Sequence, residues 1–244
     1  MPRFFVPTEN FDENTARITG DDAFHIARAL RMAVGDEITV CDMKGSEHIC
    51  RLSRIRDEEC VCEILESRAG KTESPVEVTL YMGYPKGDKL ELIIQKAVEL
   101  GAVKIVPFES SRCVKRPKAD KIERQMARLS RIAEEASKQC GRGVIAEVAA
   151  PVPFASALVD AAGADIALFC YEGEGALTVK EALSANKTAK TISVMIGCEG
   201  GFSIAEAEAA RNAGMKSVGL GPRILRCETA PMYALSAISY EFEL

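Results

Sequence analysis

The chain has 244 residues and a formal net charge of −5, from 31 lysines and arginines against 36 aspartates and glutamates. This balance excludes proteins that coat nucleic acid through bulk positive charge. Apolar residues make up 47% and charged residues 27%, as in an ordinary globular chain, which argues against extensive disorder. The length allows one large domain or two smaller ones.

Two kinds of targeting signal are missing from the sequence. No apolar run approaches the roughly 20 residues that cross a bilayer, and the acidic N-terminal segment lacks the hydrophobic stretch of a signal peptide. Nine cysteines without a secretion signal indicate a reducing compartment rather than a disulfide framework. We therefore expect a cytoplasmic protein with no membrane partner.

Residues 1 to about 70 read as short alternating strands separated by turn-forming residues, a spacing typical of a small barrel or sandwich. The expected strands are 37–42, 48–53 and 60–65, with one helical stretch over 21–32. The polar segment 67–74, followed by Pro75, predicts a linker. We place the boundary between two domains there, at residues 70–75.

From residue 75 onward, apolar strands alternate with amphipathic helices, which predicts an α/β domain with a parallel sheet over residues 75–244. The expected strands are 76–82, 103–108, 166–169, 191–196 and 217–220, and the expected helices include 89–100, 120–140 and 231–242. Ser203 and Glu206 form a capping-box signature for one more helix, which Gly214 ends. In this architecture ligands bind at the carboxyl ends of the strands.

Two glycine-rich turns follow consecutive expected strands, at residues 196–202 and 219–230. Glycine lets the backbone approach a flat ligand closely and bind it with N–H and C=O groups. The alternative is a pair of tight turns that hold no ligand. Neither turn carries the pattern of the common nucleotide-phosphate motifs, so a ligand without a pyrophosphate fits them better.

Residues 112–142 hold ten lysines and arginines against four acidic residues. On the expected helix, positions 124, 128, 131, 135, 138 and 142 recur every three or four residues and form one stripe, and five of these six are basic. A solvated helix face is the usual explanation of a charge run. An unbalanced stripe in an acidic chain also has the form of a phosphate-backbone contact, and the charge pattern favours contact with RNA or DNA.

Other candidate sites are less distinctive. Arg3, Phe4 and Phe5 combine a cation with rings that can stack on bases, or they form a first strand that buries Phe5. Two histidines, and no CxxC pair among the cysteines, argue against a metal site. Cys198 and Cys227 lie in the glycine-rich turns, where a small buried thiol is the simpler interpretation.

Several motifs taken in order resemble the RsmE family of ribosomal RNA methyltransferases. They are KGDK at 86–89, QKAVELG at 95–101, SKQCGR at 137–142, and above all IGCEGG at 196–201 followed by LGPRILRCETA at 220–230. The resemblance includes MPRFF at the N-terminus and so covers nearly the whole chain. Cys198 departs from it, because the family usually has proline there, and the change adds a backbone N–H and relaxes the first turn.

The resemblance implies an S-adenosylmethionine-dependent enzyme of the SPOUT superfamily that methylates N3 of one specific uridine in the 16S rRNA of the small ribosomal subunit. It also implies a PUA-like β-barrel for RNA at residues 1–70, a trefoil-knotted parallel-sheet domain at 75–244, and a homodimer without metal. Two alternatives stay open: a SPOUT enzyme that modifies another RNA or a ribose 2′-hydroxyl, and a catalytically silent RNA-binding protein of ribosome assembly.

Residue roles follow from the same resemblance. Arg226 stabilises charge on a uracil oxygen, and Glu199 or Glu228 accepts the N3 proton or orients Arg226, unless Glu228 only begins a helix. The cofactor is expected on Tyr171, Glu172, Gly173, Ile196, Gly197, Glu199, Gly200, Gly201, Leu220, Gly221, Ile224, Leu225, Arg226, Thr229 and Ala230. RNA is expected on Arg3, Arg28 and Arg31 of the small domain and on Lys86, Arg112, Lys138 and Arg142 of the large one.

Overall fold

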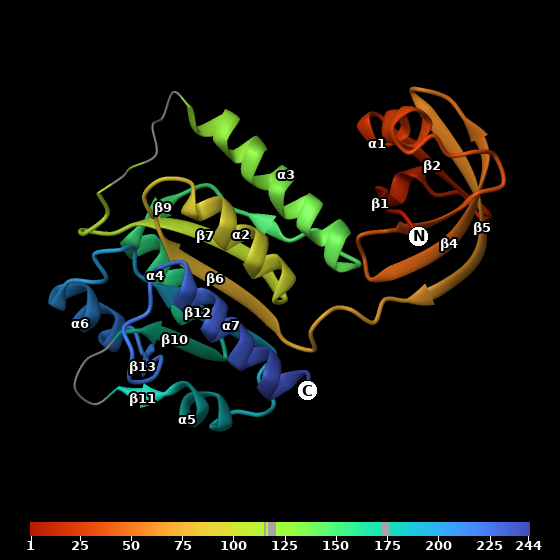
Figure 1. Ribbon diagram of the computed structural model, residues 1–244. Coiled ribbons are helices and arrows are strands. Elements are labelled where there is room, and N and C mark those ends of the chain that lie inside the picture. The colour runs from red at the N-terminus through yellow and green to blue at the C-terminus, as the bar shows by residue number, and fades with distance from the viewer. Residues whose placement is uncertain (115, 117–120, 172–175) are drawn as a thin grey trace. The chain divides into compact units, whose positions relative to one another are not determined.

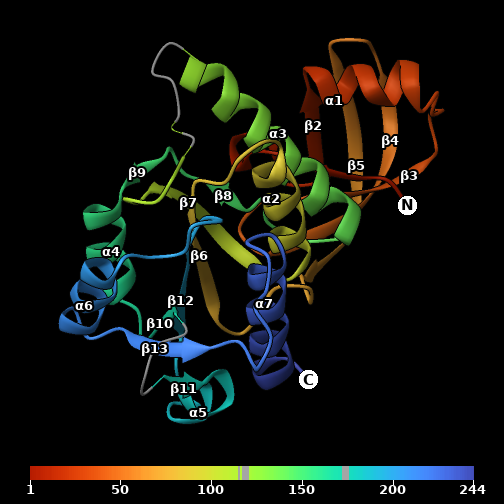
Figure 2. The ribbon, with the colours of Figure 1, turned by 60° about the vertical axis from the view of Figure 1, so that its left-hand side comes forward.

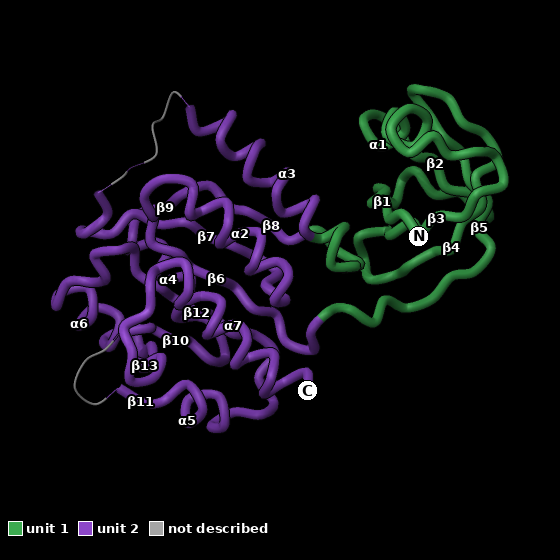
Figure 3. The backbone as a smooth tube through the Cα atoms, in the orientation of Figure 1, with its two compact units in different colours: residues 1–73, 137–145 green, residues 74–136, 146–244 purple. Residues whose placement is uncertain are grey.

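The computed structural model describes residues 1–114, 116, 121–171 and 176–244. These residues form two compact units, one made of residues 1–73 and 137–145 and the other of residues 74–136 and 146–244 (Figure 3). The first unit therefore includes a short segment from the middle of the chain, which sequence periodicity did not indicate.

The first unit is built on a curled sheet with the strand order β1-β3-β4-β5-β2 (Figure 1). Its strands are β1 (Arg3–Phe5), β2 (Thr15–Thr19), β3 (Glu37–Cys41), β4 (Ser46–Ile55) and β5 (Glu59–Ala69). Strands β1 and β3 are parallel, and the other neighbouring pairs are antiparallel. Ile18, Ile38 and Leu52 are among the buried side chains that form the apolar core of this unit.

In the first unit, the structure refines two sequence expectations and agrees with a third. The expected helix over 21–32 is a short α1 (Asp21–Phe24) that continues as a π-helical turn (His25–Ala29). Strand β5 extends to Ala69 because its last residues pair with β4, so the linker begins later than the polar composition predicted. Phe4 and Phe5 are both buried in β1, as the first-strand interpretation requires.

The second unit contains a sheet with the strand order β11-β13-β10-β12-β6-β7-β8, and β9 also pairs with β7. The neighbouring strands run parallel. The strands are β6 (Glu77–Gly83), β7 (Ala102–Glu109), β8 (Glu147–Val148), β9 (Val152–Pro153), β10 (Ile166–Cys170), β11 (Leu177–Thr178), β12 (Thr191–Ile196) and β13 (Lys216–Gly219). Strands β10 and β12 are buried on both faces, which is typical of central strands in a parallel sheet.

Helices cover both faces of this sheet: α4 and α6 lie on one side, and α2 and α7 on the other (Figure 2). The helices are α2 (Lys89–Glu99), α3 (Ile122–Cys140), α4 (Phe154–Ala162), α5 (Val179–Ser184), α6 (Ile204–Asn212) and α7 (Thr229–Phe242). The predicted capping box is confirmed, because Ser203 and Glu206 exchange hydrogen bonds at the start of α6. Gly101 follows α2 with a φ of +88°, a left-handed conformation that ends a helix.

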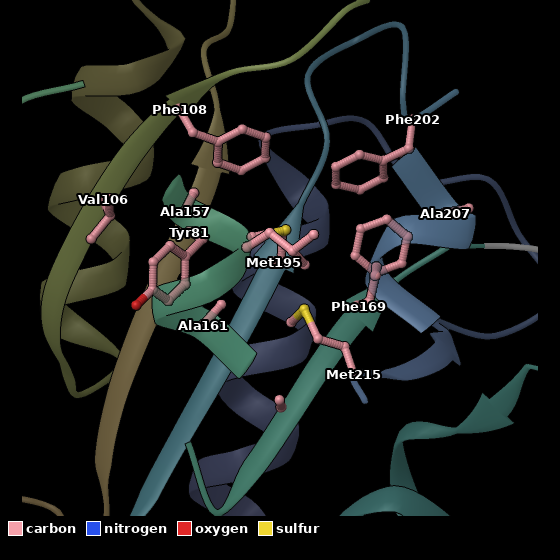
Figure 4. Close-up of a cluster of buried hydrophobic side chains, with 13 residues drawn as sticks. Tyr81, Val106, Phe108, Ala157, Ala161, Phe169, Met195, Phe202, Ala207 and Met215 are labelled. Atoms are coloured by element: carbon pink, nitrogen blue, oxygen red, sulfur yellow. The ribbon is translucent and has the colours of Figure 1, made fainter. Parts of the chain in front are cut away.

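A cluster of aromatic and methionine side chains fills the space between the sheet and helices α4 and α6 (Figure 4). Phe108 and Phe169 come from β7 and β10, and Phe202 comes from the turn that follows β12. The ring centroids of Phe169 and Phe202 are 4.3 Å apart, and the rings of Phe108 and Phe202 stack at 6.1 Å. The cluster therefore anchors this turn to two strands of the sheet.

The carboxyl end of β6 leaves no room for a side chain. A Cβ atom on Gly83 would lie 2.4 Å from the backbone nitrogen of Cys198 and 2.9 Å from the carbonyl carbon of Gly197. A Cβ atom on Gly200 would lie 2.9 Å from the Cβ of Arg112, in the segment after β7. The turn at 197–201 therefore approaches both neighbouring segments as closely as backbone alone permits.

We expect Gly83→Ala to lower the free energy of unfolding by about 1–3 kcal/mol, because the added methyl group must push β6 and the turn apart. Gly219→Ala is the matched control in the same sheet, since its Cβ would meet no atom of the described residues within 4 Å. Urea unfolding of both variants measures the difference. Equal stability of the two variants would contradict the close approach.

Candidate active site

A cavity of about 560 Å³ opens in the second unit where strands β10, β12 and β13 end. Carboxyl ends of parallel strands are where α/β sheets bind ligands. The structure brings most of the predicted cofactor-binding residues to the wall of this cavity: Tyr171, Ile196, Gly197, Glu199, Gly201, Leu220, Ile224, Leu225, Arg226 and Ala230. Both glycine-rich turns thus face one space.

The other predicted cofactor-binding residues are placed differently. Gly200, Gly221 and Thr229 belong to the same turns but do not line the cavity. Glu172 and Gly173 lie outside the described residues. Arg112, which the sequence suggested for RNA, lines the cavity and donates from Nη1 to the carbonyl oxygen of Gly200 at 3.1 Å.

Lys89 also lines the cavity, although sequence reasoning assigned it no role. Its Nζ lies 3.2 Å from Oε1 of Glu199 and 3.1 Å from Oε2 of Glu228. Glu199 belongs to the turn after β12, and Glu228 immediately precedes α7. One signal could have identified Lys89: it is the first residue of α2, where the helix dipole disfavours a positive charge, so a partner elsewhere is needed.

The two carboxylates are held in their ionised form. Burial by itself raises the pKa of Glu199, but hydrogen bonds from backbone N–H groups and from Lys89 outweigh this effect and lower the pKa below its ordinary value. The same balance, with Lys89 and Cys227 among the donors, lowers the pKa of Glu228. Hydrogen bonds to Glu228 and Glu199 raise the pKa of Lys89. Near neutral pH, this cluster therefore holds two carboxylates and one ammonium group, and Arg112 and Arg226 add two positive charges to the cavity wall.

Arg226 differs from Lys89 in being largely exposed at the cavity. Its side chain is 85% exposed, and its Nη1 lies 4.0 Å from Oε1 of Glu228, too far for a hydrogen bond. The guanidinium group is therefore able to contact a bound substrate. Glu228 occupies the N-cap position of α7 without making a side-chain cap hydrogen bond, so its nearest ionic partner is Lys89.

The cysteines of the cavity are neutral thiols. Burial raises the pKa of Cys170 to about 12, and burial followed by the hydrogen bond to Glu228 raises that of Cys227 to about 12. Hydrogen bonding with Cys113, together with burial, raises the pKa of Cys198, which stands where the RsmE family usually has proline. Because the thiolate is the nucleophilic form of cysteine, these raised pKa values make the three side chains poor nucleophiles.

The predicted RNA-binding residues lie in two environments. Arg142 is buried and its Nη2 lies 2.6 Å from Oε2 of Glu73, while Lys138 pairs with Asp22 at 2.8 Å. Both belong to the first unit, whereas the sequence placed them on the larger domain. Arg3 is also mostly buried and pairs with Glu47.

The remaining predicted RNA contacts are exposed. Arg28, Arg31, Lys86 and Arg112 all face solvent, although Arg28 pairs with Asp57. The basic stripe of α3 is shorter than predicted, because the helix ends at Cys140 and Arg142 lies beyond it. Within α3, Arg128 pairs with Glu91, and Arg131 pairs with Glu135.

In the described part of the chain, no group of three or more His, Cys, Asp or Glu side chains could hold a metal ion. Among the helices formed by these residues, none has the length and apolar character needed to span a bilayer.

Comparison with known proteins matches both units to described families. Residues 72–239 match the RNA methyltransferase domain and residues 18–65 match the RNA methyltransferase PUA domain. The chain is 36% identical to a Bacillus subtilis protein named ribosomal RNA small subunit methyltransferase E, over 100% of this chain and 98% of that relative. A protein of the same name from Synechocystis is 32% identical, over 97% of this chain and 77% of the relative.

A solved structure shows the same fold. It is a ribosomal RNA small subunit methyltransferase E from Neisseria gonorrhoeae bound to S-adenosyl methionine. It superposes with a TM-score of 0.86 at 32% identity and covers 98% of this chain and 97% of that one. The parallel-sheet unit is thus of the SPOUT type, and it follows an N-terminal PUA domain.

We expect Phe202→Ala to cost about 3–5 kcal/mol of stability, because it leaves a void beside Phe169 in the floor of the cavity. Thermal and urea unfolding measure the loss. Phe24→Ala is the control with the same change of side chain, and because Phe24 is 55% exposed we expect its effect to stay within about 0.5 kcal/mol. Similar losses in both variants would show that Phe202 does not anchor the turn.

Proposed function

This chain belongs to the RsmE family of ribosomal RNA small subunit methyltransferases, and we propose that it transfers a methyl group from S-adenosylmethionine to N3 of a specific uridine in the 16S rRNA. One observation carries the proposal: the two turns that bear the family motifs, 196–201 and 220–230, meet at one cavity with Arg226 in its wall. Cofactor, target base and charged side chains can therefore share one space.

The cavity fits the chemistry of this cofactor. Its volume of about 560 Å³ lies within the usual range for small-molecule sites. Backbone groups of the turns would bind the adenine and ribose beside Tyr171, and Phe202 and Leu220 supply apolar walls. The cofactor has no phosphate group, in keeping with turns that lack a phosphate motif. When bound, it supplies an electrophilic methyl group on a cationic sulfur, and Glu199 is the carboxylate of the cavity wall that such a cation could approach.

The residues of the chain supply position and charge for the transfer. Methyl transfer to N3 is an in-line displacement, in which correct placement of the two reactants contributes much of the rate. The N3 proton must leave, and the negative charge spreads to a neighbouring uracil oxygen. Arg226 stabilises that charge, and Glu199 or Glu228 accepts the proton, since both are ionised near neutral pH.

We propose that the exposed cations make the RNA contacts. Arg28 and Arg31 in the first unit, and Lys86 and Arg112 in the second, are accessible to a phosphate backbone. A target base within folded RNA must be turned out to enter the cavity. For Arg3, Lys138 and Arg142, whose partners are Glu47, Asp22 and Glu73, we propose that they shape the first unit on which RNA lies.

The remaining properties that the family implies are proposed in the same way. The PUA-like domain corresponds to residues 1–70 and the methyltransferase domain to 75–244, with a trefoil knot near the glycine-rich turns.

We propose a cytoplasmic homodimer that pairs through α7, because Tyr233, Tyr240 and the nearby Ile224 expose large apolar surfaces, with Ile224 90% exposed. Size measurement by light scattering tests the dimer.

Mass mapping of 16S rRNA from a deletion strain tests the proposed reaction. We expect one N3-methyluridine to be lost, and to return when the gene is restored. Survival of that mark would overturn the target assignment. Loss of a ribose 2′-O-methyl group or of a tRNA modification would identify a different substrate, and an unchanged RNA pattern with no cofactor binding would indicate a silent RNA-binding protein.

We expect Arg226→Ala to reduce kcat by about 10²–10³-fold, because the charge that develops on the uracil oxygen loses its partner. Calorimetry should show that S-adenosylmethionine binding changes little. The control is Arg223→Ala, which removes an exposed arginine from the same turn outside the cavity wall. Full activity of Arg226→Ala, or equal loss in both variants, would remove Arg226 from the proposed mechanism.

A further inference from the structure

The positive charge of Lys89 lies at an unfavourable position in its own helix. It is the first residue of α2, and a cation at a helix N-terminus opposes the helix dipole. Its side chain is only 34% exposed, so solvent does not fully compensate this placement. Its position is instead explained by partners that lie far away in sequence.

Those partners tie three segments of the second unit together. The Nζ of Lys89 lies 3.2 Å from Glu199, 3.1 Å from Glu228 and 3.7 Å from the sulfur of Cys227. The backbone N–H of Lys86 donates to Glu199 at 3.1 Å from the loop before α2. One ammonium group thus joins the start of α2, the turn after β12 and the start of α7.

The same ammonium group competes with Arg226 for a carboxylate. Glu228 has Lys89 at 3.1 Å through Oε2 and Arg226 at 4.0 Å through Oε1. If Lys89 were neutral, Arg226 would be the remaining cation beside Glu228 among the described residues. The other cation of the cavity wall, Arg112, donates to the Gly200 carbonyl instead. Glu228, which does not itself line the cavity, would then draw the Arg226 guanidinium away from the substrate.

We propose that Lys89 is a positioning residue for methyl transfer, which fixes Glu199 and Glu228 beside the cavity and so leaves the Arg226 guanidinium available to the substrate. This inference rests on the proposed function, because it assigns Arg226 to the target base. It adds a residue that neither glycine-rich turn contains, and it gives the first turn of α2 a part in the reaction.

The charge arrangement also sets a pH dependence. The charged or titratable groups here are Lys89, Glu199, Glu228, Cys227 and Arg226, with Arg112 in the same cavity wall from the segment after β7. The raised pKa of Cys227 leaves it without charge near neutral pH. Because Lys89 is one of the donors that lower the pKa of both carboxylates, its removal should raise their pKa values toward or above the ordinary range. Protonation of the two carboxylates would then begin at higher pH. The pH at which activity declines on the acidic side of the profile would rise with it.

Three variants separate positioning from a merely structural effect. Lys89→Met removes the charge, and Lys89→Arg retains it. Lys104→Met is the matched control, because Lys104 has a 35% exposed side chain and an ion pair to Glu147 at 3.1 Å on strands β7 and β8. Two readouts are needed: ¹³C titration of the glutamate carboxyl groups in the ligand-free protein, and the pH profile of kcat and KM with labelled S-adenosylmethionine and small-subunit RNA.

For Lys89→Met we expect the two carboxylate midpoints and the acid limb of kcat to rise by about one pH unit. We expect kcat at neutral pH to fall by about 10²-fold, as for a misplaced catalytic group, with little change in the KM for the cofactor. Lys89→Arg, which keeps the positive charge, should restore most of the original pH midpoints and most of the original kcat. Lys104→Met should behave as the unmodified protein does.

Unchanged titration midpoints in Lys89→Met would overturn the proposal. A fall in kcat with an unmoved acid limb, and no recovery in Lys89→Arg, would also overturn it, because this pattern indicates a structural role alone. Failure of the proposed function looks different: the unmodified protein would then transfer no methyl group to small-subunit RNA, while the titration would still report whether Lys89 holds the two carboxylates.

Discussion

The closeness of the turn at 197–201 to the end of β6 is the constraint on which the site depends. At Gly83 the two backbones approach so closely that a Cβ atom would overlap Cys198, and at Gly200 a Cβ atom would lie 2.9 Å from the Cβ of Arg112. These contacts fix the path of the chain as it leaves β12. They thereby determine where Glu199 and Gly201 enter the cavity wall.

Two further interactions hold the turn from opposite sides. Below it, the ring of Phe202 packs on Phe169 and Phe108, so apolar burial fastens the turn to the sheet. On its other side, Lys89 binds Glu199 and also Glu228, which brings the second glycine-rich turn to the same place. Three interactions therefore shape one cavity: the close backbone contact at Gly83, the aromatic cluster, and the ion pairs of Lys89 with the two glutamates. Preorganisation of this kind is what a site for in-line group transfer requires.

Elements with strong local patterns could be predicted from the sequence, and those stabilised by distant partners could not. The apolar period of α2 and the capping box of α6 are local signals, and both are found in the structure. The alanine-rich α4 was missed because it packs mainly through small side chains under the aromatic cluster. Arg142 was assigned to an exposed stripe because periodicity cannot reveal Glu73, its partner from a distant segment. The place of Lys89 in the site was also not predicted, because its partners Glu199 and Glu228 lie in distant segments of the chain.

We propose that the two glycine-rich turns, held by these contacts, form the methyl-donor site, and a crystal structure of this chain with S-adenosylmethionine would show whether they do. We expect the adenine and ribose to contact the backbone of 196–201 and 220–225, with Arg226 on the side where the methyl group points. A cofactor bound away from these turns, or a cavity that stays empty at saturating cofactor, would contradict it.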